Sequence, residues 1–300
     1  MKIHKISPDL SLIQLDQNLT GFTSFIGAWL YQDSEVTFLV DVGPAATVPV
    51  LLTALSELSV TNLDVILLTH IHIDHAGGTG DLIQKYPETP VVCHQSGIKH
   101  LADPAKLWEG SKKTLKETAL AYGPISPVPE DLLQDAAEFN RYNIQPILTP
   151  GHASHHVSYL FNEILFAGEA GGVYTQLDQN AYFLRPATPP RYIYETSLES
   201  LNKLLATPHK ILCYGHFGAT PNTPSLLEKH KNQLDCWLNT LSTVAAKARA
   251  SSRLEEAFDK LLRQDPLLHT WEDLPATIQQ REKSFMMNSI RGFLGYLENK

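Results

Sequence analysis

Three histidines and one aspartate lie close together in residues 69–75, which read THIHIDH. Imidazole nitrogens and carboxylate oxygens are ligands that zinc, iron and manganese accept, and the absence of cysteine from this set favours a catalytic over a closed structural site. If the chain stays extended here, side-chain alternation places His70, His72 and Asp74 on one side and the two isoleucines on the other. The segment therefore predicts a metal site.

Three further candidate ligands each follow a short apolar run that is typical of a strand. His152 follows a Pro-Gly turn in TPGHASHH, Glu169 lies in LFAGEA, and His216 lies in CYGHFG. Each is a weak indication alone, because a histidine at a strand end is often a hydrogen-bonded structural residue. Binding loops gather at the carboxyl ends of strands in layered α/β folds, so the four features together predict one shared centre.

The elements around these residues indicate an α/β protein. The runs LSLIQL, SFIGAWLYQ and VTFLVDVG are short, apolar or alternating, as in strands joined by turns. After Pro44, apolar residues recur at helical spacing as far as Leu58. NLDVILLTH predicts a strand buried on both faces, and the histidine motif begins where it ends. Gly77 and Gly78 permit a turn into a helix that runs to Tyr86, and TPVVCH predicts a further strand.

The second half of the chain mixes strands with longer helical stretches. Residues 95–138 contain helical segments separated by prolines, and we expect them to form a helical lid. Strands return with YNIQPILT, HVSYLF, ILFAG and HKILCYGH. After Pro224 the amphipathic runs 226–248, 254–263 and 278–297 predict helices. These helices would form a C-terminal cap or a homodimer surface.

Composition and charge restrict the partners. The chain of 300 residues is 43% hydrophobic, which is sufficient for a sizeable core. A net charge of −8 without a basic cluster disfavours nucleic acid, so we expect a small-molecule substrate. The three cysteines form no CxxC pair, which fits a reducing cytoplasm. The polar N-terminus does not resemble a signal peptide, and no apolar run approaches the ~18 residues of a membrane span. We expect a cytoplasmic protein without a membrane partner.

The order of these motifs resembles that of the metallo-β-lactamase superfamily of hydrolases. HxHxDH, a GH, a strand-terminal glycine with an acid, and a final GH follow one another within about residues 1–220. The resemblance implies an α/β fold, a four-layer αβ/βα sandwich with a helical lid insertion and C-terminal helices. It divides the chain into a metallo-β-lactamase-like domain over 1–224 and a helical extension over 225–300. It also implies two divalent metal ions, with zinc expected and iron or manganese as alternatives.

The resemblance assigns each candidate ligand to a metal. The first metal would be held by His70, His72 and His152, and the second by Asp74, His75 and His216. Glu169 stands where the family usually has an aspartate that bridges both ions. Because glutamate is one methylene longer, it could bridge the ions, bind one of them, or bind neither, and this leaves the metal count open.

A second departure and a few weaker candidates concern the surroundings of the metals. GHASHH differs from the family's commoner GHTxGH, and we expect His156 to orient its neighbours and His155 to be exposed. Arg185 could meet an anionic group, with a solvated or paired arginine as the alternative. Four aromatic residues could line an apolar pocket or belong to an ordinary core, namely Trp108, Tyr122, Tyr174 and Phe183.

These expectations combine into a mechanism. Metal-bound hydroxide would attack a carbonyl carbon, and Asp74 would move the proton, so no serine or cysteine nucleophile is needed. The expected function is a dinuclear metal-dependent hydrolase of a small ester, thioester or lactone. Two alternatives stay open: a non-haem iron redox protein of the same fold, and a regulatory binding protein that retains the metal site.

Overall fold

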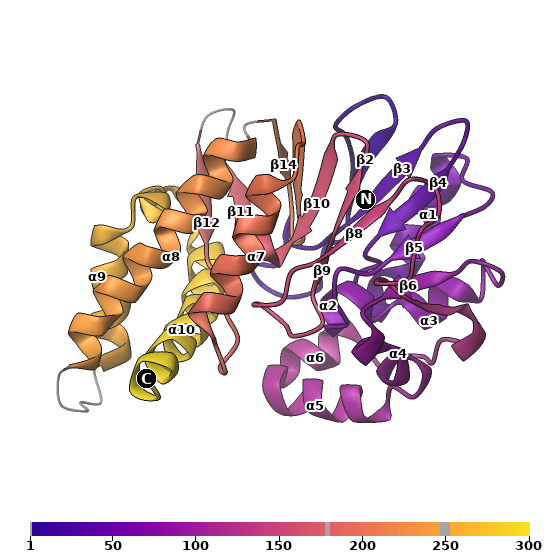
Figure 1. Ribbon diagram of the computed structural model, residues 1–300. Coiled ribbons are helices and arrows are strands. Elements are labelled where there is room, and N and C mark those ends of the chain that lie inside the picture. Colours follow the sequence, from indigo (N-terminus) through magenta and orange to yellow (C-terminus); the bar gives the residue numbers. More distant parts are fainter. Residues whose placement is uncertain (1, 178–180, 222, 247–252) are drawn as a thin grey trace.

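The computed structural model describes residues 2–177, 181–221, 223–246 and 253–300, and their strands form two sheets and a hairpin (Figure 1). The first sheet contains, in chain order, β1 (Lys2–Lys5), β2 (Leu10–Gln14), β3 (Gly27–Gln32), β4 (Thr37–Val40), β5 (Val65–Leu67), β6 (Val91–Cys93) and β7 (Leu133–Asp135). The second sheet has the order β14 (Ala219–Thr220), β13 (Ile211–Tyr214), β10 (Ile164–Gly168), β9 (Val157–Phe161) and β8 (Gln145–Leu148). The hairpin pairs β11 (Val173–Gln176) with β12 (Tyr182–Arg185).

Helices cover the outer sides of both sheets (Figure 1). On the side of the first sheet lie η1 (Ala45–Thr47), α1 (Val48–Glu57), α2 (Ile73–Ala76), α3 (Thr79–Ile83), α4 (Gln95–Ala102), α5 (Ala105–Leu115), α6 (Glu117–Tyr122) and η2 (Glu130–Leu132). On the side of the second sheet lie η3 (Glu169–Gly171), α7 (Tyr194–Ala206), α8 (Thr223–Ala245), α9 (Arg253–Gln264), η4 (Pro266–Leu268), η5 (Trp271–Asp273) and α10 (Ala276–Glu298). Within the described ranges, no helix combines the length and apolarity needed to cross a bilayer.

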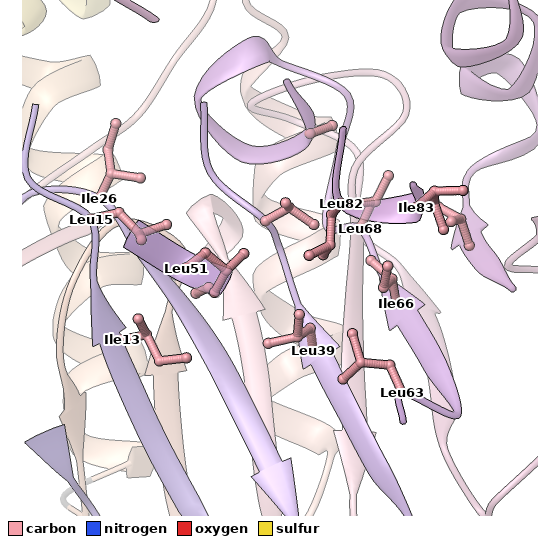
Figure 2. Packing of buried hydrophobic residues seen from close by; sticks show 14 of the residues in the cluster. Ile13, Leu15, Ile26, Leu39, Leu51, Leu63, Ile66, Leu68, Leu82 and Ile83 are labelled. Atoms are coloured by element: carbon pink, nitrogen blue, oxygen red, sulfur yellow. The ribbon is translucent and has the colours of Figure 1, made fainter. Parts of the chain in front are cut away.

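Side-chain alternation along the strands explains the layers. Successive side chains of a strand face opposite sides of its sheet. Phe38 of β4 points between the two sheets, where its ring meets the ring of Phe166 from β10 at 5.9 Å. The next residue, Leu39, points the other way and belongs to the same buried cluster as Leu51 of α1 (Figure 2). The result is a four-layer αβ/βα sandwich, as predicted.

The outer side of the second sheet shares a core with the C-terminal helices. Leu165 and Ala167 of β10 belong to the same buried cluster as Trp237 of α8 and Phe293 of α10. Trp237 is fully buried, and its Nε1 donates a hydrogen bond to Asp265 at 2.7 Å. Because apolar burial is the main stabilising term in folding, α8 and α10 are held on the sheet by the same cluster that stabilises it.

Two predicted elements differ in detail from the observed ones. The insertion over 95–138 contains α4, α5 and α6 as expected, but also β7, which pairs in parallel with β6 and completes the first sheet. A helix follows Gly78 as expected, namely α3, but the short helix α2 was not expected, and because it begins at Ile73 the extended course of the histidine motif ends at His72. Asp74 therefore lies in the first turn of a helix, and strand alternation does not place it.

The C-terminal helices correspond to the three predicted amphipathic runs. The runs over 226–248, 254–263 and 278–297 match α8, α9 and α10, and the last two residues of the first run lie outside the described part of the chain. Helix α7 and the hairpin of β11 and β12 were not predicted from any pattern in the sequence. The division into 1–224 and 225–300 stays a prediction, since the helices of the second part pack into a cluster with strands of the first.

Helix α10 approaches the segment after β12 closely, and this contact can be tested. A Cβ on Gly292 would lie 2.3 Å from the carbonyl oxygen of Pro189, whereas a Cβ on Gly295 would lie 3.7 Å from that of Pro190. We expect Gly292→Ala to lower the free energy of unfolding by about 1–2 kcal/mol, because overpacking outweighs the gain in helix propensity. Gly295→Ala, the matched control, should leave it unchanged or raise it by up to about 1 kcal/mol. Urea unfolding measures both, and equal effects would contradict the close approach.

Candidate metal centre

Seven candidate ligands from four segments meet at one place. They come from the segments after β5, β10 and β13 and from the loop between β8 and β9. Within each of two groups, the possible ligand atoms all lie within 4.8 Å of one another. The first group is His70, His72, His152 and Glu169, and the second is Asp74, His75 and His216. The structure thus brings together all seven residues to which the sequence pointed.

The histidine motif is held in place by its own isoleucines. Ile71 and Ile73 are buried in the cluster between the first sheet and its helices. His72 is still extended, with φ −61° and ψ 147°, and it is the N-cap of α2. The first turn of α2 then carries Asp74 and His75. The change from extended chain to helix directs ligands toward both groups from a single short segment.

The carboxylate of Glu169 lies between the two groups. Its Oε2 is 2.9 Å from Nε2 of His152, 3.2 Å from Nε2 of His70 and 3.5 Å from Nε2 of His75. Its Oε1 is 3.0 Å from Nε2 of His216. The two oxygens therefore reach both groups, although this residue is a glutamate and not the expected aspartate.

His156 holds the backbone at Glu169. Its Nε2 accepts a hydrogen bond from the Glu169 amide at 3.1 Å, so its Nδ1 carries the proton and donates to Oγ1 of Thr149 at 2.8 Å. Thr149 continues the network to Oγ of Ser158 at 2.9 Å. Gly168 has φ 58°, and a Cβ there would lie 2.4 Å from His156 Nε2. Only glycine permits this approach, so His156 lies directly against the turn that carries Glu169.

Asp41 is a site residue that the sequence analysis missed. It follows β4, and its Oδ2 lies 2.8 Å from Nδ1 of His75. The same carboxylate accepts hydrogen bonds from the amide and the hydroxyl of Thr69, both at 2.8 Å. Because Nδ1 of His75 donates to Asp41, Nε2 is left as the atom that can bind a metal. The signal in the sequence was the acid in VTFLVDVG, directly after the strand that pairs with β5.

Burial and neighbouring charges set the protonation of the site. Burial lowers the pKa of His72 to about 3. Burial also acts to lower the pKa of His75, but the charge of Asp41 and other carboxylates outweighs it and raises this pKa to about 10. Burial acts to raise the pKa of Glu169, yet two neighbouring imidazoles hold it well below its usual range. A neutral imidazole and an ionised carboxylate are the forms that bind cations, so His72 and Glu169 are ready to bind, whereas His75 would release a proton when a metal binds to it.

The donor atoms of the site fit divalent metal ions. The Nε2 atoms of His70 and His75 are buried and have no hydrogen-bond partner within the described residues. A buried polar atom without a partner costs about 1–3 kcal/mol. A cation placed among these nitrogens and the Glu169 carboxylate would satisfy both. Histidine with carboxylate is also the donor set of catalytic zinc, iron and manganese sites.

A cavity of about 750 Å³ opens onto the candidate ligands. Residues of α4, α5 and α6 line one side, and residues after β12 and of α10 line the other. The insertion therefore covers the site. Tyr122 and Arg185, two of the predicted pocket residues, line the cavity, whose size is typical of small-molecule sites.

Other predicted pocket residues lie elsewhere. Trp108 packs against the cluster beside the first sheet, and Phe183 is fully buried in the cluster of the C-terminal helices. Tyr174 is buried there too and stacks on a tyrosine of β13 at 4.6 Å. Of the two alternatives, packing in the core accounts for these three residues, and none of them is among the described residues that line the cavity. His155 corrects another expectation: it lines the cavity, with its ring 6.2 Å from that of His70, and is not fully exposed.

Asp41 provides a test of how the centre is built. We expect Asp41→Asn to weaken metal binding about 10–100-fold, because the amide cannot accept from both Thr69 and His75 with the full charge of the carboxylate. Competition with a chromogenic chelator measures the affinity. Asp64→Asn is the control, since Asp64 accepts from the amide of Thr37 in the same sheet but lies outside the two ligand groups. An unchanged affinity in the Asp41 variant would refute the supporting role.

Comparisons with known proteins agree with this arrangement. The family model described as the metallo-beta-lactamase superfamily matches residues 24–216, more than half of the chain. A metallo-beta-lactamase fold-containing protein of Sulfurisphaera tokodaii is 32% identical over 182 residues, which are 57% of this chain and 66% of that protein. A hydroxyacylglutathione hydrolase of Actinobacillus pleuropneumoniae is 32% identical over 143 residues, which are 47% of this chain and 48% of that protein. The chain thus matches about half to two thirds of the length of these relatives.

Solved structures share the fold. An archaeal metallo-beta-lactamase superfamily protein from Sulfolobus tokodaii has a TM-score of 0.68 at 23% identity, covering 98% of this chain and 100% of the other. A metallo-beta-lactamase family protein from Thermus thermophilus has a TM-score of 0.62 at 22% identity, covering 90% and 95%. The match of the family model, the HxHxDH cluster and the fold all agree, and the chain belongs to the metallo-beta-lactamase superfamily.

Proposed function

We propose that this chain is a dinuclear metal-dependent hydrolase of a small ester, thioester or lactone. The observation that carries the proposal is the pair of ligand groups around the buried Glu169 carboxylate, at the wall of a cavity of small-molecule size. Membership of a superfamily with named metallo-hydrolases supports it. A relative named hydroxyacylglutathione hydrolase supports an acyl compound as the substrate class.

The candidate ligands form two sets, one for each metal ion. One ion would bind to His70, His72 and His152, the other to Asp74, His75 and His216, and Glu169 would contact both. When bound, such a pair of divalent cations lowers the pKa of a shared water toward neutrality and polarises the carbonyl oxygen of the substrate. The cavity walls formed by the insertion and by α10 would orient the substrate and limit its contact with bulk water.

Asp74 is the residue to which we assign proton movement. Its side chain is 18% exposed and lines the cavity, whereas that of Glu169 is 5% exposed and held by four imidazoles. One Asp74 oxygen lies 3.8 Å from Nε2 of His75, so the other would be the oxygen that accepts a proton from the attacking water and returns it to the leaving group.

Removal of a candidate ligand tests the hydrolase assignment. We expect His72→Ala to lower turnover by more than about 100-fold on a panel of esters, thioesters, lactones and phosphodiesters, since even the loss of a residue that only supports a ligand costs about 10–100-fold. His269→Ala is the matched control, because His269 is exposed and lies outside the ligand groups. Equal turnover in both variants would contradict the assignment.

Glu169 tests the number of metals. We expect Glu169→Gln to reduce the metal content from two equivalents per chain and to abolish turnover, because the negative charge between the imidazoles is lost. Elemental analysis measures the content. Glu163→Gln, which changes an exposed glutamate between β9 and β10, should retain two equivalents. One equivalent of iron in the unaltered protein, with oxygen uptake and no hydrolysis, would instead identify the redox alternative, and metal without either activity would identify a regulatory protein.

A further inference from the structure

The cavity contains a buried arginine whose hydrogen bonds are incomplete. Arg185 is 3% exposed and lines the cavity. Its Nε donates to Glu282 of α10, and its Nη1 donates to the carbonyl oxygen of Pro186 at 3.3 Å. Its Nη2 makes no hydrogen bond to any residue in the described ranges, yet it is not among the polar atoms sealed from solvent. The free edge of the guanidinium is therefore accessible from the cavity.

The charges around Arg185 do not balance. Glu282 is fully buried and is shared with a second buried arginine, Arg281, whose Nε donates to Oε1 of Glu282 at 2.8 Å. Two positive charges and one negative charge leave one positive charge without a counter-ion in this cluster. Arg281 also lies over the ring of Phe25 at 3.9 Å and donates to the carbonyl oxygen of Gly21. Arg185 is thus the member of the cluster that can offer its charge to a ligand.

The walls of the cavity favour an anion. Lys99 of α4 and Lys106 of α5 line it from the insertion. The carboxylates among its described lining residues are Asp74 and Glu169, and both belong to the candidate metal centre. Phe285 of α10 lies against the guanidinium of Arg185, with 5.2 Å between the Cζ atom and the ring centroid. An arginine held on one edge by Glu282 and on one face by Phe285 is preorganised to bind with its remaining edge.

We propose that Arg185 anchors a negatively charged oxygen group of the substrate, so that the substrate is an ester or thioester bearing a carboxylate or a phosphate. Glu282 is the positioning residue that holds the guanidinium in the cavity wall. A free guanidinium edge suits this group, since it donates charge-assisted hydrogen bonds to carboxylate and phosphate oxygens. The statement that the substrate is an ester or thioester rests on the proposed function. The anion site itself rests only on the contacts and charges around Arg185.

Matched thioesters test the substrate class. S-acetylmercaptoacetate and its uncharged amide differ only in the charged group, and the S-acetyl derivative of 2-mercaptoethyl phosphate supplies the phosphate arm. We expect kcat/KM to be higher for a charged substrate than for the amide, and Arg185→Gln to reduce this preference about 10–100-fold, mainly through KM, at unchanged metal content. Arg185→Gln leaves Arg281 and Glu282 as a neutral pair. Arg253→Gln, the control, removes a largely buried arginine outside the cavity and should keep the preference.

A binding measurement separates the two proposals. Calorimetric titration of the full chain with succinate and with inorganic phosphate requires no turnover, and Arg185→Gln should bind the preferred anion at least about tenfold more weakly. Binding that depends on Arg185, without hydrolysis of any ester, thioester or lactone, would refute the proposed function and keep the anion site. Equal kcat/KM for charged and uncharged thioesters, with no anion binding that depends on Arg185, would overturn the inference. The better substrate of the two charged arms identifies carboxylate or phosphate.

The positioning role of Glu282 has its own test. Glu282→Gln alone would leave two buried arginines without a counter-ion and endanger folding. Combined with Arg281→Gln, it keeps one positive charge in the cluster and removes only the carboxylate that holds Arg185. We expect the KM for the preferred charged thioester to rise and the KM for the amide to stay unchanged. A parallel change in both KM values would show a merely structural role and contradict the inference.

Discussion

The centre depends on one buried carboxylate placed within contact of four imidazoles. Burial of a charge is costly unless close partners compensate, and Glu169 has them on both oxygens. The position of that carboxylate follows from the backbone, since His156 binds the Glu169 amide and Gly168 permits the turn between them. The two ligand groups therefore form only when the segments after β5, β10 and β13 and the loop between β8 and β9 have come together.

The C-terminal helices stabilise the fold and shape the cavity at the same time. The inner side of α10 contributes Phe293 to the cluster that packs on the second sheet. The same helix supplies Glu282, which binds the arginine of the cavity wall, and Phe285, which lines the cavity. Through Arg281 and Phe25 it also reaches His216, because the Phe25 ring stacks on that imidazole at 4.2 Å. A change in the packing of α10 would thus alter both the wall of the cavity and the contacts of His216 in the candidate metal centre.

Several site residues could be predicted from local patterns, and others could not. His70 and His72 could be predicted because two isoleucines, which are buried, alternate with them in the sequence. Asp41 was not, because its role arises from a hydrogen bond to a histidine 34 positions later in the chain. Likewise the aromatic residue Tyr174 gave no sign of which side of the hairpin it would face, and it packs in the core. The sequence shows that a residue is aromatic, but its packing partners in the folded protein determine whether it lies in the core or in a pocket.

The sequence by itself determined the donor set, the strands that carry it and the layered class of fold, because ligand type, apolar runs and alternation are local properties of the chain. It left undecided whether a glutamate could take the place of the expected aspartate. The tertiary structure places its two oxygens near both ligand groups, and these distances depend on how β10 and β13 pair. It also decided that Arg185 faces the cavity, because the glutamate that holds it lies 97 positions away on α10. Contacts of such separation follow from packing, and no local pattern encodes them.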